Sequence, residues 1–462
     1  MTKKINWGLY FSVVSINLTS FITGAAYSWT SPVIPKLNNP EKIADNPFGR
    51  LITPFEESWL ASLISVGAAI GPILSAIVVD KIGRKKTLLV LTIPMIIPNL
   101  VLAFAKNINL YYFSRFFLGL GIGSVYSIVP IYVGEIAEDT NRGTLGCCIS
   151  VMYVFGTVFC FIIGPLLTIK SLCLVLVVPA VLFVLIASFY VPESPYYLLM
   201  VGRKEEAEVA LRKLRKSFDE KELEEMTKNV ELSKSVKIKF GEIVKSRIIR
   251  KGVMIGSGLI FFQQCSGITV IVAYMQSIFE ASGSSLKPEI CAIIIGMIQL
   301  STNLVTSQLI DRLGRRILLL GSLIGMFLSH VLLGLYFWLK INHFHNIVSH
   351  LFWVPVCSLI FYFIMFTTGV GPVSWSMLGE IFPTHVRSHA STFVCCFCSV
   401  FGFFLTLFFP NLAQIMGLGF TFWGFAGCCL VGVGFVWRVV PETRGKSLLE
   451  IQQILEYGSI KN

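Results

Sequence analysis

Charged residues are scarce in this chain. Lys, Arg, Asp and Glu make up only 14% of its 462 residues, whereas a soluble globular protein has about 25%. The hydrophobic share is 54% and the mean hydropathy is +0.74. A chain with so few charges is poorly suited to a large water-exposed surface, so we expect an all-α integral membrane protein.

Signatures of enzyme chemistry are also missing. No Gly-rich loop has the GK[ST] spacing of a nucleotide site, and no covalent catalytic constellation is present. The twelve cysteines lie almost wholly within apolar stretches, without zinc-binding spacing or the pattern of a secreted disulfide framework. We therefore expect no enzyme activity, no cofactor and no bound metal, and we interpret the cysteines as small packing residues.

A cleavable signal peptide is not evident. The stretch from Trp7 to Pro35 is too long for one and is better interpreted as a first spanning helix. The net charge of +12 would suggest nucleic acid as the partner of a soluble protein. Here the basic residues gather in short loops beside apolar segments, so we expect a lipid bilayer and no nucleic acid.

Twelve apolar segments are long enough to cross a bilayer, which takes about 20 residues each. They lie near 8–33, 58–79, 87–105, 109–134, 143–167, 171–190, 252–280, 289–310, 315–339, 351–379, 386–411 and 416–437. If they alternate in direction, the most basic loops and the tail from Arg438 share one side. This predicts a multi-pass plasma-membrane protein with both termini in the cytoplasm.

Acidic and basic residues alternate in one soluble insert, which is typical of solvated amphipathic helices; a plain linker is the alternative. Leu211, Leu214, Leu223 and Met226 recur at helical spacing and favour the helices. The predicted domains are a six-helix bundle (1–193), a cytoplasmic helical linker (194–250), a second six-helix bundle (251–440) and a cytoplasmic tail (441–462).

Short charged patterns recur in the same order in both halves. They pair Asp80 with Asp311, Arg84 with Arg315, Glu135 with Glu380, Arg142 with Arg387, and Glu193 with Glu442. This register predicts two bundles of one topology, related by an axis along the membrane normal. Ion pairs between the bundles could latch the cytoplasmic side when the protein opens outward. The alternative is that these charges only fix loop geometry and topology.

Polar side chains interrupt the apolar stretch Phe261–Tyr274. Gln263, Gln264 and Thr269 lie inside a predicted spanning helix, where an amide is costly unless it faces a partner or a wet cavity. Bonding to neighbouring helices is one explanation. The other is recognition of a polar solute near mid-depth, because amides both donate and accept hydrogen bonds.

Three further residues extend this candidate site. Gln299 lies at mid-depth of the eighth segment, and Trp375 offers an indole with an apolar face and one N–H donor. Asn411 follows Pro410 near a helix end and either lines an outer mouth or caps the helix. Arg115 is a charge inside the fourth segment, and such residues are functional candidates.

The motifs together resemble the sugar porter family of the major facilitator superfamily. They are DKIGRKK (80–86), SRFFLGLGIG (114–123), PIYVGEIAEDTNRG (130–143), VPESPYYL (191–198), QQCSGI (263–268), DRLGRR (311–316), GPVSWSMLGEIFPTHVR (371–387) and PETRGKSLLEI (441–451). The resemblance spans the whole chain. It is strongest to insect-type facilitated trehalose and glucose transporters, as judged by WTSP (29–32), IQL (298–300) and the WSMLGEIFPT run.

This resemblance implies sugar transport by alternating access. It implies that Gln263 and Gln264 bind sugar hydroxyls, with Gln299 and Trp375 at the same cavity. Two departures leave the sugar open. Thr269 stands where the family usually has Asn, and Ser150 stands near the position of a Gln typical of glucose carriers.

The resemblance leaves three functions to separate. Proton-coupled members pair the equivalent of Arg115 with a first-helix Asp, but residues 8–35 contain no acidic residue. We therefore expect facilitative uniport of glucose, another hexose or trehalose, with a proton-coupled symporter as the alternative. A non-transporting sugar receptor is the alternative of another class, and the short tail after the PETRGKS run speaks against it. The sequence carries no signal for an oligomeric state.

Overall fold

The computed structural model of this chain describes residues 7–138, 141–215, 218–235, 247–283, 286–382, 387–444, 446 and 448–457. Within these ranges the regular structure is helical, and no β-strand occurs. Twelve helical spans are long and apolar enough to cross a membrane, and they follow the twelve predicted segments in order. The predicted all-α, twelve-span architecture is confirmed.

The spans of the first half are α1 (Trp7–Ser28) continued by α2 (Thr30–Leu37), α3 (Pro54–Ile82), α4 (Arg84–Phe104), α5 (Ile108–Ile136), α6 (Arg142–Leu166) and α7 (Ile169–Phe189). Those of the second half are α12 (Arg247–Cys265) continued by α13 (Ile268–Ala273) and α14 (Met275–Ser282), α15 (Pro288–Leu313), α16 (Arg315–Ile341), α18 (Val354–Thr368) continued by α19 (Val370–Ile381), α20 (Arg387–Ile415) and α21 (Gly417–Val439). The other helices are η1 (Pro40–Asp45), α8 (Pro195–Met200), α9 (Lys204–Leu214), α10 (Glu220–Ser235), α17 (His345–His350) and α22 (Leu448–Tyr457).

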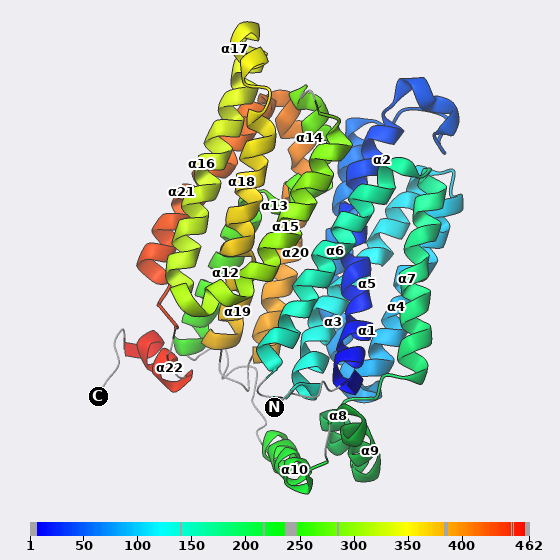
Figure 1. Ribbon diagram of the computed structural model, residues 1–462, viewed down its shortest axis with the longest axis vertical. Helices are drawn as coiled ribbons and strands as arrows, with labels where there is room; N and C mark the ends of the chain where they lie inside the picture. The colour runs from blue at the N-terminus through cyan, green and yellow to red at the C-terminus, as the bar shows by residue number, and fades with distance from the viewer. Residues whose placement is uncertain are drawn as a thin grey trace.

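The two halves form two bundles that stand side by side (Figure 1). They meet where α3 packs against α20 and α6 packs against α15. Counted within each half, α3 and α15 are second spans, while α6 and α20 are fifth spans. Both contacts therefore join a second span to a fifth span, as two like bundles related by an axis along the membrane normal would require.

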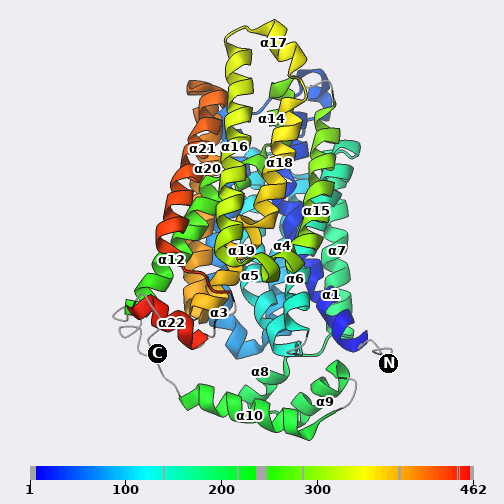
Figure 2. The same ribbon diagram turned by 60° about the vertical axis from the view of Figure 1, so that its left-hand side comes forward.

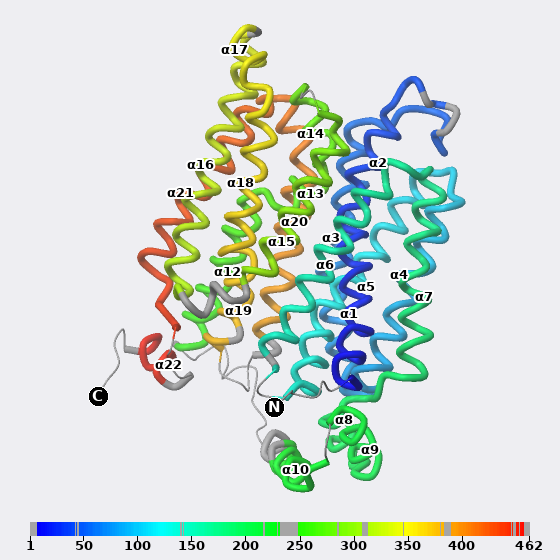
Figure 3. Tube along the Cα trace, viewed as in Figure 1, coloured from blue at the N-terminus to red at the C-terminus, as the bar shows by residue number. Residues whose placement is uncertain are grey.

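The beginning of α1 lies at one end of the molecule, together with α8, α9, α10 and α22 (Figures 1 and 3). The view turned by 60° shows α9 and α10 lying beyond the ends of the spans (Figure 2). Leu211, Leu223 and Met226 are buried in one cluster with residues of α8. The predicted amphipathic helices are therefore present, and the plain linker is excluded for the residues of α9 and α10.

Three spans are interrupted where the sequence analysis expected continuous segments (8–33, 252–280 and 351–379). The first bends at Trp29, where Pro32 has no N–H to give to the preceding turn. The seventh breaks at Gly267, whose φ is +83°. The tenth breaks at Gly369, where a Cβ would lie 2.4 Å from the Leu318 carbonyl oxygen of α16. The causes are backbone geometry and close approach, which hydropathy does not report.

Candidate functional site

The break in the seventh span follows directly after the two glutamines. Helix α12 ends at Cys265, and the Gly267 N–H donates to the Gln264 carbonyl over 2.9 Å. The left-handed conformation of Gly267 is strained for residues that carry a Cβ, so glycine suits this position. The break places Gln263 and Gln264 in the last turn of α12, next to a change of helix direction.

Gln263 is only partly satisfied by the protein. Its side chain is 7% exposed, and its Nε2 donates to the Gly371 carbonyl of α19 at 3.3 Å. Its Oε1 is buried, and the described residues offer it no hydrogen-bond partner. Buried amide oxygens normally accept a hydrogen bond. Because the described residues supply none here, Oε1 can accept a hydrogen bond from a hydroxyl of a bound solute.

Gln264 is held at both ends of its amide. Its Nε2 donates to the Cys398 carbonyl of α20 at 3.2 Å, and its Oε1 accepts from the Thr269 hydroxyl at 2.6 Å. The two neighbouring glutamines therefore differ in what they can offer a ligand. In this arrangement Thr269 orients Gln264, while Gln263 retains an unused acceptor.

Trp375 contacts the opposite half of the molecule. Its ring lies parallel to that of Tyr126 on α5, with centroids 6.5 Å apart and an interplanar angle of 11°. Tyr126 and Tyr27 each lie beside Tyr153 of α6, at centroid distances of 6.3 Å and 6.4 Å. These four partly exposed rings form an aromatic wall between the halves. The three tyrosines were not predicted, because the sequence does not show which face of each helix meets the other half.

The remaining predicted residues occupy different surroundings. Gln299 is buried on α15, one turn after Gly296, where a Cβ would lie 2.9 Å from a methyl group of Val158 on α6. Gln299 therefore lies close to the contact between the halves. Asn411 is exposed on α20, and no described interaction joins it to the glutamines.

A further amide on the seventh span was missed. Gln276 of α14 is 3% exposed, and its Nε2 has no partner among the described residues. Its backbone N–H donates to the Ser31 hydroxyl of α2 over 3.3 Å, across the contact between the halves. Its position in the predicted span 252–280 was a signal that could have identified it.

Two side chains anchor the broken helix from behind. The Ser266 carbonyl, adjacent to Gly267, lies 2.9 Å from His330 Nε2 and accepts from the Tyr362 hydroxyl at 3.0 Å. The Ser266 hydroxyl in turn donates to the Gln263 carbonyl at 2.7 Å. His330 and Tyr362 are completely buried, so the turn that carries Gln263 is fixed to α16 and α18.

Arg115 is bound to backbone instead of to an acid. Its Nε donates to the Leu60 carbonyl at 3.1 Å and its Nη1 donates to the Ala26 carbonyl at 2.8 Å. The guanidinium lies 5.3 Å from the centre of the Trp29 ring. The residue is 1% exposed, and no carboxylate of the described residues forms a salt bridge with it. Arg115 thus ties α5 to α1 and α3 beside the bend of the first span.

The repeated charges of the first half form one network at the end that carries the beginning of α1. Arg84 binds Glu135 through Nη2 at 2.9 Å and Asp80 through Nη1 at 3.1 Å. Glu193 accepts from the backbone N–H groups of Arg84 and Lys85, each at 2.9 Å. A carboxylate at the start of α4 is favourable because the first N–H groups of a helix are unpaired.

The second half repeats this network. Arg315 Nη2 lies 3.1 Å from Glu380, and Glu442 accepts from the backbone N–H groups of Arg315 and Arg316 at 3.1 Å and 3.0 Å. Partial burial works to raise the pKa of Glu442, but its backbone N–H donors hold that pKa below its usual value. The described pairs all join residues of the same half. The side chains of Arg142, Asp311 and Arg387 lie outside the described part of the structure.

The family described as "Sugar (and other) transporter" matches residues 17–455 of the chain. A facilitated trehalose transporter of Polypedilum vanderplanki is 32% identical over 96% of this chain and 87% of its own length. A facilitated trehalose transporter homologue of Drosophila simulans is 34% identical over 96% of this chain and 90% of its own. The xylose transporter of E. coli, in a partially occluded inward-open conformation, superposes with a TM-score of 0.77 at 22% identity, covering 95% of this chain and 99% of that one. At this identity the structural likeness shows the fold alone.

Proposed function

Since this chain belongs to the sugar transporter family, we propose that it carries a sugar across the membrane by facilitated diffusion. The sugar binds between the two halves, and the halves rock around it so that the site opens to one side at a time. The observation that carries this proposal is the buried Oε1 of Gln263 beside a helix break, an acceptor that the described residues leave without a hydrogen bond.

Each candidate side chain has a role in this proposal. Gln263 accepts a hydrogen bond from a sugar hydroxyl, and Gln264, oriented by Thr269, keeps one lone pair of its Oε1 for a second one. Trp375 and its tyrosine neighbours supply the apolar face against which a pyranose ring packs. We assign Gln299 to the wall of the same cavity and Asn411 to its mouth.

We propose trehalose, glucose or another hexose as the substrate. The related insect proteins are named facilitated trehalose transporters, which favours trehalose. The small side chains of Thr269 and Ser150 leave room for a disaccharide. Uniport is favoured over proton coupling, because Arg115 bonds backbone carbonyls, and the described residues offer it no carboxylate partner that could carry the proton.

We further propose that the repeated charges bias the two conformations. In each half they tie the end of the fourth span to the turn between the second and third spans, so each bundle moves as a unit. Pairs across the halves would then form when the protein opens outward. The residues of this proposed latch are Asp80, Arg84, Glu135, Arg142, Glu193, Asp311, Arg315, Glu380, Arg387 and Glu442.

The protein is a multi-pass membrane transporter, and we propose that it lies in the plasma membrane with both termini in the cytoplasm. The beginning of α1 and helix α22 lie on the side of the basic turns, which supports this orientation (Figure 1). We also propose that the chain divides into a first bundle (1–193), a helical linker (194–250), a second bundle (251–440) and a tail (441–462).

Uptake into proteoliposomes tests the proposal. Radiolabelled trehalose and glucose are compared for the wild type and for Gln263→Ala, with Gln453→Ala in α22 as the matched control. We expect Gln263→Ala to raise the half-saturation concentration at least tenfold, since a hydrogen bond to a buried amide contributes about 1.5 kcal/mol. The control should transport like the wild type. Normal kinetics for Gln263→Ala would remove this residue from the site.

The same vesicles separate the rival functions. Accumulation of sugar above the outside concentration, driven by an imposed proton gradient, would replace the uniporter with a symporter. Retained sugar binding without any flux would favour the receptor.

A further inference from the structure

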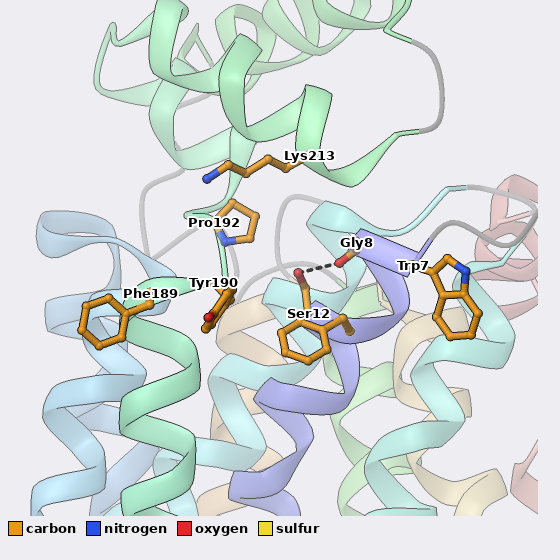
Figure 4. Close-up of a pocket in the computed structure, with 8 residues that line it drawn as sticks. Trp7, Gly8, Ser12, Phe189, Tyr190, Pro192 and Lys213 are labelled. Carbon is orange, nitrogen blue, oxygen red and sulfur yellow. Dashed lines mark hydrogen bonds between the residues drawn. The ribbon is translucent and has the colours of Figure 1, made fainter.

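A cavity outside the contact between the halves lies where the spans of the first half meet the extramembrane helices. It has a volume of about 470 Å³ and opens beside the beginning of α1 and the end of α7. Figure 4 shows that Lys213 of α9 bounds it on the extramembrane side, while Phe189 and Tyr190 bound it on the side of the spans. The cavity therefore lies at the boundary between bilayer and water.

Its rings are unusually exposed. Trp7, Phe189 and Tyr190 have exposed fractions of 74%, 77% and 68%. Phe11 packs edge-on against Tyr190, with centroids 6.1 Å apart. Trp and Tyr at the ends of membrane spans prefer the headgroup region, where the ring contacts the acyl chains and its N–H or O–H remains hydrated. Lipid is thus the natural cover for this aromatic side of the cavity.

The other side of the cavity is basic. The preceding residue on α9, Arg212, is neutralised by Glu208 at 2.7 Å, but no carboxylate of the described residues forms a salt bridge with Lys213. Lys85 lies near both Lys213, which repels it, and Glu193, which attracts it more strongly. Lys85 Nζ donates to the Ser188 carbonyl at the end of α7, which fixes one cation beside the cavity. Glu193, which also accepts from backbone N–H groups, is the carboxylate that serves Lys85, so Lys213 is the cation of the cavity lining that no carboxylate of the described residues pairs.

We propose that this cavity binds one anionic phospholipid, with its phosphate at Lys213 and its glycerol and acyl region against Trp7, Phe189 and Tyr190. A negative headgroup pairs with Lys213, which no carboxylate of the described residues does, whereas a zwitterionic headgroup of zero net charge attracts this cation less. The bound lipid joins α9 to α1 and α7, and so ties the extramembrane helices to the first bundle. This site does not depend on the transported solute.

Native mass spectrometry of the full chain tests the site. The protein is released from nanodiscs made of equal parts phosphatidylcholine and phosphatidylglycerol, and the retained lipid is counted. We expect the wild type to retain one phosphatidylglycerol, and Lys213→Gln to lower this retention about fivefold, the effect of one basic residue at an anionic surface. Arg212→Gln removes the same charge from the adjacent residue and should retain the lipid.

Three outcomes decide the matter. Equal retention by Lys213→Gln and the wild type overturns the proposal, and so does retention of the two lipids in equal amounts. Displacement of the lipid by excess inorganic phosphate would make this a phosphate site instead of a lipid site. Melting temperatures in phosphatidylcholine alone confirm that each variant is folded. Because the readout is bound lipid, failure of the proposed sugar transport would leave this result intact.

Discussion

The first spans of the two halves are both interrupted, but the two interruptions are stabilised differently. The bend at Trp29 is stabilised by a cation, because Arg115 donates a hydrogen bond to the last turn of α1 and lies over the Trp29 ring. The break at Gly267 is stabilised by neutral groups, because His330 and Tyr362 form hydrogen bonds with the Ser266 carbonyl. A cation suits the carbonyl end of a helix and holds it tightly.

The difference between the two interruptions coincides with the place of the proposed sugar-binding amides. Neutral hydrogen bonds are weaker and exchange more easily than those of a buried guanidinium. The bend of the first half is thus held by a charged side chain, while the break beside Gln263 and Gln264 in the second half is held by neutral hydrogen bonds. The two halves are similar scaffolds. The amides that we propose bind the substrate lie mainly in the second half, whose interruption is held by neutral hydrogen bonds.

The largest expected effect comes from removing the cation. Arg115→Leu should lower the free energy of unfolding by about 3 kcal/mol, because two charged hydrogen bonds between helices are lost. His330→Leu removes one neutral bond and should cost about 1 kcal/mol. Thermal unfolding in detergent compares the two variants, and Arg115→Lys, which keeps the charge, should recover part of the loss. Equal melting temperatures for Arg115→Leu and His330→Leu would contradict the claim that the bend at Trp29 is held more strongly than the break at Gly267.

An intermediate effect is expected from the repeated charge networks. The side chains of Arg84 and Glu135 are 7% and 17% exposed, against 17% and 26% for Arg315 and Glu380. Glu135→Gln should therefore destabilise its half by about 2 kcal/mol and Glu380→Gln by about 1 kcal/mol, because screening weakens the more exposed pair.

Hydrogen–deuterium exchange along α4 and α16 measures the two effects separately. If both charge networks also serve the latch, each variant should in addition raise the exchange of α5 and α19 near the contact between the halves. Faster exchange confined to the mutated half would restrict these charges to fixing loop geometry.

The smallest effect concerns the anchor of the break. Tyr362→Phe removes only the hydroxyl that bonds the Ser266 carbonyl, and should raise the half-saturation concentration for sugar about fivefold, the equivalent of about 1 kcal/mol. Its maximal rate should change little, since the loss is in the positioning of Gln263. Tyr336→Phe is the matched control: Tyr336 is equally buried and bonds the Ser282 carbonyl at 2.8 Å, at the far end of α14. Equal kinetics for the two variants would assign Tyr362 to packing alone.

Local pattern predicted most of the architecture. The twelve spans follow from runs of apolar residues, because a bilayer imposes a minimum length that hydropathy reports directly. The two bundles follow from repeated pairs such as Arg84 with Glu135 and Arg315 with Glu380, since duplicated sequence folds into duplicated structure. Gln263 and Gln264 were found because amides are rare and costly in a membrane span.

What each of these residues does was decided by contacts between distant segments. The sequence by itself placed Thr269 five residues after Gln264, but only the folded α12 and α13 show that its hydroxyl holds that amide. It found the charge of Arg115, but not that carbonyls of α1 and α3 satisfy it. The aromatic wall of Trp375, Tyr126, Tyr153 and Tyr27 depends on four helices presenting one face each to a common gap. Hydropathy and spacing determine that a membrane span exists, whereas its breaks, its rotation and its partners are set by backbone geometry and packing, which only the tertiary structure contains.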